Sequence, residues 1–376
     1  MAAAYGRGPD RSYFAGCSNG GRHALVATSR FAADYDGILA GAPGWQLPKA
    51  AVVNIFGAQR YASVATNAAD ISTGFTLAER RVLSAAVVTR CDALDGATDG
   101  LVQDTAACQA RFSLASDVPT CSGARDGTCM SAAQKTALAP IFSGATTSDG
   151  RSFYSSFPYD SGHGGGGVAF WEFTAPVALD SGAVGFVFGS PPQVVAGFNG
   201  PAFALTANID TLVASITATS GLYTESGMQF MTPPNPGRLN TLRDRGAKVL
   251  LYHGVSDPIF SSEDTKAWLL AVMANHIDAP DFARYFPVPG MGHCLGGPAT
   301  DQMDLLSPLV AWVEQGTAPE RITATARGAG NAGGVNADVP SNWSATRTRP
   351  LCPWPLVARY KGSGEIEVES SFECRT

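Results

Sequence analysis

Short, continuous apolar runs at the two ends of the chain are followed by stretches with an apolar residue at every third or fourth position. The run RSYFAGCS at 11–18 leads into a turn and then into a helical pattern at 20–35, and a second run, DGILAGAP, follows at 36–43. A strand–turn–helix–strand order of this kind is typical of a parallel sheet. The pattern therefore predicts an α/β fold.

The same alternation returns towards the C-terminal end. The run AKVLLYHG at 247–254 predicts a strand, the stretch at 261–276 predicts a helix with a serine N-cap, and ARYFPV at 283–288 predicts another strand. A helix that stops at Gly316 and a last short strand at 355–360 follow. These elements extend the predicted sheet.

The block between the two halves has a different character. Residues 47–239 combine helical pieces, such as the one at 76–91, with long stretches rich in Gly, Ser and Pro, and 152–237 contains no Lys or Arg. We interpret 47–239 as a domain inserted into a core that is formed by 1–46 and 240–376.

Composition narrows the class of protein. The chain has 376 residues, of which 45% are hydrophobic and 15% are charged, and its net charge is −6. This length suggests two domains or one enlarged domain. Lys and Arg form no basic run, so we expect no nucleic acid partner. No continuous apolar stretch reaches the roughly 18 residues of a membrane span, so we expect none.

A candidate nucleophile follows the first predicted strand. Gly16-Cys17-Ser18-Asn19-Gly20 fits the pattern G-x-S-x-G. In this strand-to-helix turn the serine hydroxyl is exposed, and side chains at the glycine positions would clash with the flanking strand and helix. The backbone N–H of Asn19, at the start of the helix, would face a developing oxyanion. We predict that Ser18 is a catalytic nucleophile rather than part of a plain glycine-rich turn.

A serine nucleophile needs a base, and the base needs an orienting acid. In this architecture the chain order is serine, acid, histidine. Asp257 follows the strand at 247–254 and His293 follows the strand at 283–288, so both fall at carboxyl ends of strands. His253 also ends a strand, but it precedes Asp257. We therefore predict Asp257 as the acid and His293 as the base, with His253 as the alternative base.

The eight cysteines are even in number and include no CxxC pair, which favours disulfides and an oxidising compartment over a metal site. Cys17 precedes Ser18 and Cys294 follows His293. If Ser18 and His293 share a hydrogen bond, the two cysteines come within reach of a disulfide. We predict a Cys17–Cys294 bridge; the alternative is two buried thiols.

An acidic loop, CDALDGATDGLVQD, occupies 91–104. Its carboxylates would repel one another without a cation, and Ca²⁺ takes six to eight oxygen ligands. Three carboxylates and two backbone carbonyls are available: Asp92, Asp95, Asp99, Ala97 and Leu101. The spacing is not that of an EF-hand, and a solvated turn is the alternative. Because Cys91 and Cys108 flank the loop and could clamp it, we predict a structural calcium ion.

Five segments in order resemble the tannase and feruloyl esterase family: SYFAGCSNGGRHAL with DYDGILAGAPGW, CDALDGATDGLVQD, MQFMTPP, LLYHGVSDPIF and VPGMGHC. The resemblance covers nearly the whole chain. It implies an α/β-hydrolase core with a large calcium-binding lid, secretion or a periplasmic location, and a triad of Ser18, Asp257 and His293. It also implies the calcium ligands named above and three short-range bridges: Cys91–Cys108, Cys121–Cys129 and Cys352–Cys374.

The N-terminal end departs from the family pattern. Only 17 residues precede Ser18, whereas several strands precede the nucleophile turn in this fold, and one of their loops supplies the second oxyanion donor. We interpret the chain as lacking those strands and the secretion signal, which puts its activity by itself in question. A rearranged but complete sheet is the alternative.

The resemblance implies hydrolysis of esters of aromatic acids through an acyl-enzyme. A substrate with a free carboxylate would need an Arg partner, and 152–237 contains no cation. We therefore expect a small neutral phenolic ester, of the feruloyl or tannase type, as substrate. The alternatives are a terephthalate half-ester or a truncated, inactive family member. We expect Leu47, His253 and Phe260 to line the substrate pocket.

Overall fold

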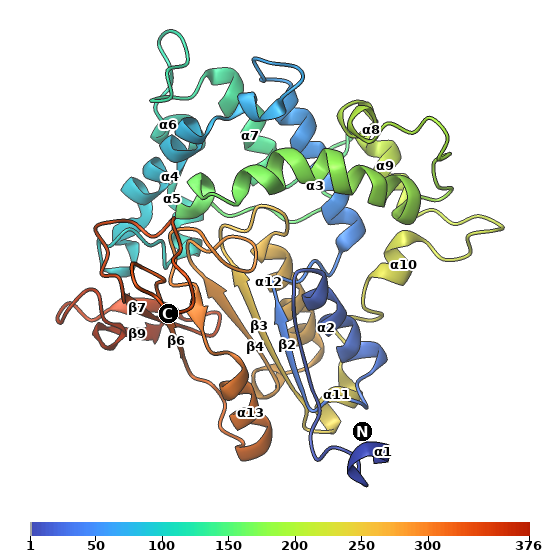
Figure 1. The fold of residues 1–376 in the computed structure, drawn as a ribbon, viewed down its shortest axis with the longest axis vertical. Coiled ribbons are helices and arrows are strands. Elements are labelled where there is room, and N and C mark those ends of the chain that lie inside the picture. The colour runs from blue at the N-terminus through green and yellow to red at the C-terminus, as the bar shows by residue number, and fades with distance from the viewer. Residues whose placement is uncertain (1) are drawn as a thin grey trace.

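The computed structural model describes residues 2–376, and a parallel sheet of four strands lies at its centre (Figure 1). The strands follow one another across the sheet in chain order: β1 (Tyr13–Cys17), β2 (Gly37–Gly41), β3 (Lys248–Gly254) and β4 (Ala283–Val288). Cys17 pairs with Gly41, and Gly41 pairs with Tyr252. The carboxyl ends of the strands therefore meet at one edge. Each strand lies within a run that the apolar pattern predicted.

Different elements cover the two faces of this sheet. On one face, α2 (Asn19–Arg30) and α12 (Ser262–Asn275) pack against the strands, and the indole of Trp268 is completely buried there. On the other face, α13 (Leu306–Gln315) packs through Leu309, which is also completely buried. The helices thus leave the carboxyl edge of the sheet free for the rest of the chain.

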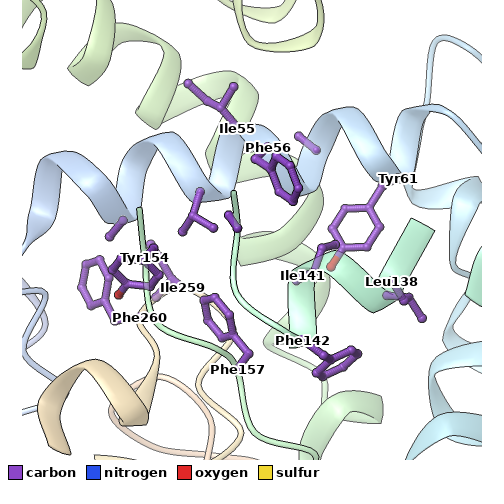
Figure 2. Close-up of a cluster of buried hydrophobic side chains, with 14 of the residues drawn as sticks. Ile55, Phe56, Tyr61, Leu138, Ile141, Phe142, Tyr154, Phe157, Ile259 and Phe260 are labelled. Atoms are coloured by element: carbon purple, nitrogen blue, oxygen red, sulfur yellow. The ribbon is translucent and has the colours of Figure 1, made fainter. Parts of the chain in front are cut away.

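Residues 42–247, which we call the insert, connect β2 to β3. Most of the insert lies as a helical layer at the carboxyl ends of the strands, whereas α11 (Asn240–Asp244), just before β3, lies near their amino ends (Figure 1). The helix α3 (Leu47–Ala62) runs through this layer and is buried along most of its length. Figure 2 shows Phe56 and Tyr61 among the aromatic and aliphatic side chains around it. Phe260, from the loop after β3, belongs to the same apolar cluster. The insert and the sheet therefore share one continuous core at this point.

The remaining α-helices have between 4 and 15 residues. They are α1 (Ala2–Tyr5), α4 (Leu77–Cys91), α5 (Thr105–Arg111), α6 (Leu114–Asp117), α7 (Ala132–Phe142), α8 (Gly200–Thr206), α9 (Ile209–Ser215), α10 (Gly227–Met231) and α11 (Asn240–Asp244). Three successive stretches of the insert have π-helical hydrogen bonding: Phe170–Thr174, Pro176–Asp180 and Ala183–Phe188. Within residues 2–376, no helix has both the length and the apolar character needed to cross a membrane.

Two small antiparallel sheets complete the C-terminal part. One contains β5 (Gln302–Met303), β6 (Ile322–Thr325) and β7 (Thr348–Leu351), and the other contains β8 (Val357–Tyr360) and β9 (Phe372–Arg375). The strand predicted at 355–360 contains β8, and β5, β6, β7 and β9 were not predicted.

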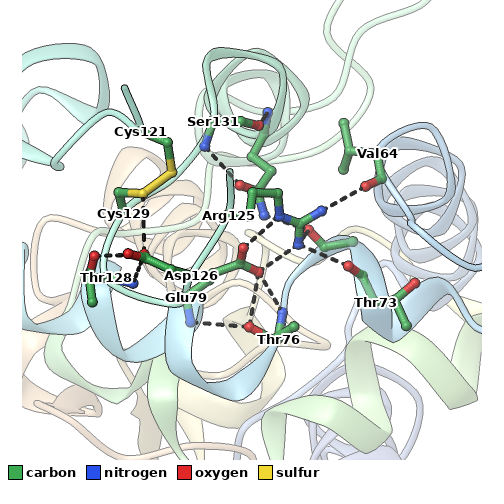
Figure 3. A network of polar contacts seen from close by, with 12 residues as sticks. Val64, Thr73, Thr76, Glu79, Cys121, Arg125, Asp126, Thr128, Cys129 and Ser131 are labelled. Atoms are coloured by element: carbon green, nitrogen blue, oxygen red, sulfur yellow. Dashed lines mark hydrogen bonds and ion pairs between the residues drawn. A yellow bond between two sulfur atoms is a disulfide. The ribbon is translucent and has the colours of Figure 1, made fainter. Parts of the chain in front are cut away.

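All eight cysteines form disulfides, in the four pairs that were expected: Cys17–Cys294, Cys91–Cys108, Cys121–Cys129 and Cys352–Cys374. The Cys121–Cys129 bridge closes a loop whose half-buried Arg125 packs against α4 (Figure 3). Arg125 donates to both carboxylate oxygens of Glu79, at 2.6 and 2.7 Å, and to the carbonyl oxygen of Thr73 at 2.9 Å. This loop is therefore fixed by an ion pair as well as by its disulfide.

Candidate active site

Ser18 lies in the sharp turn between β1 and α2. Its backbone has φ 62° and ψ −125°, and its N–H donates to the carbonyl oxygen of Gly41 at 3.0 Å. Positive φ is costly for a residue with a Cβ, and such strain gathers at functional sites. Asn19 is the first residue of α2, so its N–H has no partner within the helix. The turn thus presents a hydroxyl and a helix N-terminus on the same side.

The glycines around Ser18 have unequal roles. A Cβ on Gly16 would lie 2.6 Å from the carbonyl carbon of Gly20, and one on Gly21 would overlap the carbonyl oxygen of Gly41. A Cβ on Gly20 would meet open space. The predicted clash therefore holds at Gly16 and is wrong at Gly20. The residue that α2 needs to be small, where it approaches β2, is Gly21.

The structure brings Ser18, His293 and Asp257 into one hydrogen-bonded chain. His293 Nε2 lies 2.7 Å from Ser18 Oγ, and His293 Nδ1 lies 2.7 Å from Asp257 Oδ2. His293 lies in the loop after β4 and Asp257 in the loop after β3, at the carboxyl edge of the sheet. This arrangement can transfer a proton from the serine to the imidazole and hold the imidazolium by the carboxylate.

Asp257 is 2% exposed, and its second oxygen is bound as well. Oδ1 accepts the backbone N–H groups of Ile259 at 2.9 Å and Phe260 at 3.0 Å. Burial alone raises a carboxyl pKa, but the adjacent imidazoles of His293 and His253 hold the pKa of Asp257 well below its usual range. The carboxylate therefore stays ionised at pH values at which an ordinary carboxyl group would begin to be protonated.

His253 does not lie where a substrate could touch it. Its side chain is completely buried, its Nε2 lies 3.1 Å from Asp257 Oδ2, and its Nδ1 lies 2.7 Å from Thr265 Oγ1. The expectation that His253 lines the substrate pocket is wrong, because Asp257 and α12 enclose it. Its place as an alternative base is also excluded, since it faces Asp257 and not Ser18.

Two aromatic rings flank the His293 imidazole. Trp171 meets it edge to face at a centroid distance of 4.8 Å, and Phe260 does so at 5.4 Å. Phe260 is 4% exposed, so it is mainly a support of the imidazole. Leu47, the first residue of α3, is half-buried and packs against the apolar cluster of the insert. Trp171 was not among the residues expected to line the pocket.

A cavity of about 430 Å³ lies beside His293 and Trp171. Its wall includes Arg327, a cation that lies outside the stretch 152–237 considered from the sequence. Arg327 is bound to both carboxylate oxygens of Asp301, through Nε at 3.0 Å and Nη2 at 2.6 Å. The cavity therefore contains a guanidinium, but one whose charge is already paired.

A smaller cavity of about 40 Å³ borders Asp257 and is lined largely by apolar side chains of the insert. Its wall also contains Arg80 and Glu172, whose opposite charges attract each other. Burial raises the pKa of Glu172 to about 7. This space is large enough for water and too small for an aromatic substrate.

The acidic loop is compact and buried. Asp92 accepts the N–H groups of Asp99 and Gly100, each at 3.0 Å, and Asp95 Oδ1 accepts the N–H of Ala97 at 2.9 Å. Asp95 Oδ2 is buried and has no hydrogen-bond partner within residues 2–376. Burial raises the pKa of Asp95 to about 7, with Asp99 and Asp92 adding to the rise.

Asp99 differs from the other two carboxylates, because its Oδ2 is ion-paired with the buried Arg349. In the described part of the chain, no group of three or more His, Cys, Asp or Glu side chains is arranged to hold a metal ion. The unpaired oxygen of Asp95 nevertheless fits a cation, since a buried carboxylate oxygen without a donor is costly.

Comparison with known proteins adds to this geometry. The family model described as tannase and feruloyl esterase matches residues 1–375. Mono(2-hydroxyethyl) terephthalate hydrolase of Piscinibacter sakaiensis is 39% identical over an alignment that covers 100% of this chain and 65% of that protein. A probable feruloyl esterase B-1 of Neosartorya fischeri is 27% identical, with 98% of this chain and 67% of that protein covered. The chain thus spans slightly less than two thirds of its first-named relative.

Solved structures show the same fold. The crystal structure of feruloyl esterase B from Aspergillus oryzae matches 99% of this chain and 70% of its own, with a TM-score of 0.74 at 24% identity. Tannin acyl hydrolase from Aspergillus niger matches 100% of this chain and 66% of its own, with a TM-score of 0.66 at 20% identity. These likenesses support an α/β-hydrolase-like fold.

Proposed function

The chain belongs to the tannase and feruloyl esterase family, and on that premise we propose that it is a serine esterase that hydrolyses carboxylic esters of aromatic acids. The observation that carries the proposal is the hydrogen-bonded chain of Ser18, His293 and Asp257, with 2.7 Å at each of its two contacts. A family match gives the class of reaction, and this geometry gives the groups that can perform it.

In the proposed reaction, Ser18 Oγ attacks the ester carbonyl while His293 Nε2 takes its proton. Asp257 holds the Nδ1–H of His293 and stabilises the imidazolium. The backbone N–H of Asn19 donates to the oxyanion. The alcohol leaves with the proton from His293. Water then attacks the acyl-enzyme while His293 takes its proton, and the aromatic acid is released as His293 returns a proton to Ser18 Oγ.

We infer that a neutral phenolic ester is a better substrate than one with a free carboxylate. Arg327, in the wall of the cavity beside His293, is already paired with Asp301. A second anion would therefore find no uncompensated guanidinium there. The other candidate substrate is a terephthalate half-ester, and the observation in its favour is the 39% identity to a mono(2-hydroxyethyl) terephthalate hydrolase. Leu47, Phe260 and Trp171 are the proposed apolar contacts of the acyl group.

We propose further that 47–239 acts as a lid over a catalytic domain formed by 1–46 and 240–376. The insert supports this assignment because it lies over the carboxyl edge of the sheet and supplies Trp171 to the site. The disulfides and the family support secretion or a periplasmic location.

We propose that the acidic loop binds a structural calcium ion. Asp92, Asp95 and Asp99, with the carbonyls of Ala97 and Leu101, are the proposed ligands. The buried and unpaired Asp95 Oδ2 supports this set, while Asp99 would have to share its carboxylate with Arg349. The ion would neutralise the carboxylates of the loop and takes no part in the ester chemistry.

The test is release of ferulate from methyl ferulate by this chain, by Ser18→Ala and by Ser29→Ala. Ser29 is a matched control, since it lies in the adjacent helix and its hydroxyl has no hydrogen-bond partner in the described residues. We expect Ser18→Ala to lower kcat by at least about 10³-fold and Ser29→Ala to leave it unchanged. Binding of ferulate without turnover by the unaltered chain would instead identify an inactive family member. Faster cleavage of the terephthalate half-ester would refute the preference for neutral esters.

A further inference from the structure

The carboxylate of Asp257 is bound by two imidazoles, although the proposed reaction uses only one. His293 Nδ1 lies 2.7 Å and His253 Nε2 lies 3.1 Å from the same oxygen, Oδ2. The other oxygen, Oδ1, is occupied by two backbone N–H groups. The direction in which Oδ2 points is therefore decided by the two imidazoles together.

The surroundings of His253 fix its tautomer. Its Nε2 faces two acceptors, Asp257 Oδ2 and, at 3.0 Å, the carbonyl oxygen of Phe260, so Nε2 carries a hydrogen. Its Nδ1 faces only the hydroxyl of Thr265 at 2.7 Å. A hydroxyl can donate to the lone pair of a neutral imidazole. Thr265 lies in α12 and, like His253, is completely buried.

Packing alone does not require the ring nitrogens of His253 or the hydroxyl of Thr265. A phenylalanine, with a slightly larger ring, could take the place of His253 in an apolar core, and a valine would fill the volume of Thr265. Buried polar atoms are costly unless they are paired, so a pair of this kind at full burial needs a reason. Among residues 2–376, Asp257 is the one charged group to which this pair is hydrogen-bonded.

We propose that His253, held by Thr265, is a positioning residue that fixes the Asp257 carboxylate on His293 and shares its negative charge. The inference rests on the proposed function, because it concerns the acid of the same site. A carboxylate that donates part of its charge to a second N–H stabilises the His293 imidazolium less strongly. His293 then remains neutral, and able to act as base, at a lower pH.

Other ionisable groups lie near this carboxylate and do not account for the effect. Glu172, Tyr154 and Tyr285, from the insert and from β4, interact electrostatically with Asp257, and burial raises the pKa of all three. The two tyrosines are therefore neutral at ordinary pH and stay so across the acid limb of a pH profile. Glu172 titrates near 7, so its contribution is removed by comparing variants that all retain it. Arg80 and His163 line the small cavity that borders Asp257, and all variants retain them.

The experiment measures how fast a fluorophosphonate ester labels Ser18, as a function of pH, by intact-protein mass. The serine oxygen attacks phosphorus, fluoride leaves and His293 takes the proton, so the rate reports the neutral fraction of His293 whatever ester the enzyme prefers. The variants are His253→Phe, Thr265→Val and Thr265→Ser. The last keeps the hydroxyl and is the matched control. Ser18→Ala gives the unlabelled baseline.

We expect His253→Phe to slow labelling about tenfold and to move the acid limb to higher pH by roughly half a unit or more. Thr265→Val should shift the limb in the same direction by less, and Thr265→Ser should match the unaltered chain. Thr265→Val replaces the hydroxyl with a methyl group of similar size, so it keeps the test valid if His253→Phe does not fold.

The inference is overturned if the acid limb of the pH profile stays in place, or moves to lower pH, in both His253→Phe and Thr265→Val. A slower labelling rate without that shift would report only lost stability. Absence of Ser18 labelling in the unaltered chain would overturn the proposed function and this inference with it. Labelling without turnover of any aromatic ester would refute the proposed substrates only.

Discussion

The bridge between Cys17 and Cys294 should be the most consequential cross-link of the molecule. It joins the residue before Ser18 to the residue after His293, with 6.1 Å between the two Cα atoms. The perturbation is the double variant Cys17→Ala/Cys294→Ala, which leaves no free thiol. Its matched control is Cys121→Ala/Cys129→Ala, which opens the bridge of Figure 3, whose cysteines line neither of the two cavities beside the triad.

The magnitudes follow from the length of chain that each bridge closes. The sequence separation is 277 for Cys17–Cys294 and 8 for Cys121–Cys129. The chain-entropy relation gives about 5.6 kcal/mol of stabilisation for the long loop and about 2.5 kcal/mol for the short one. The two bridges nested within the long loop shorten it by few residues, and the logarithmic dependence makes that correction negligible.

The assay is equilibrium unfolding in guanidinium chloride, followed by fluorescence, with kcat measured on the same samples. We expect the Cys17/Cys294 variant to lose about 3 kcal/mol more of its free energy of unfolding than the control variant. We also expect its kcat to fall, because the bridge holds His293 beside Ser18, while the control retains its kcat. Equal losses of stability in the two variants, or an unchanged kcat in the first, would refute the reasoning.

Three further outcomes follow from the structure. Gly20→Ala should be neutral or stabilise α2 by about 0.5–1 kcal/mol. Gly21→Ala should destabilise the protein by about 1–3 kcal/mol, because its Cβ would overlap the carbonyl oxygen of Gly41 in β2. Thermal melts of the two variants test this difference. Calcium at 100 times its Kd should stabilise by about 2.7 kcal/mol, and Asp95→Asn should abolish that gain in melts with and without chelator. Burial raises the pKa of Asp264 to about 7, above the unfolded value of about 4. The folded state therefore retains this proton longer, and the free energy of unfolding falls as pH rises through that interval. Asp264→Asn should remove this part of the fall in denaturant titrations at pH 5 and 8, and an unaltered pH dependence would contradict the assignment.

The sequence predicted those elements that are determined by residues close to one another in the chain. β2, β3 and β4 were predictable because they are largely buried strands of a parallel sheet, and such strands are apolar on both faces. β1, at the edge of the sheet, is partly exposed, and it was predictable from the short run that leads into the Ser18 turn. Ser18 was predictable because a strand-to-helix turn requires small residues close to it. The Cys17–Cys294 pair followed from one assumed contact, between Ser18 and His293. The family resemblance is confirmed by the match over residues 1–375.

Other features depend on contacts between distant segments and left no pattern. His253 precedes Asp257 by four residues, yet its role could not be assigned until Thr265 of α12 was seen to enclose it. Arg349 pairs with Asp99 across 250 positions, which changes the charge of the acidic loop. Arg327 reaches the cavity beside His293 from outside the insert. The count of cations within 152–237 therefore missed the guanidinium in the wall of this cavity.

A buried carboxylate of the insert also holds the two loops that carry Asp257 and His293. Asp160, which is completely buried, accepts the hydroxyl of Ser256 at 2.8 Å and the N–H of Gly290 at 2.7 Å. Ser256 precedes Asp257, and Gly290 lies three residues before His293. One carboxylate of the insert thus holds both loops that carry the acid and the base, as the disulfide holds the base to the nucleophile. Because these supports act on backbone and neighbouring positions, the geometry of the three side chains depends on the insert as much as on the sheet.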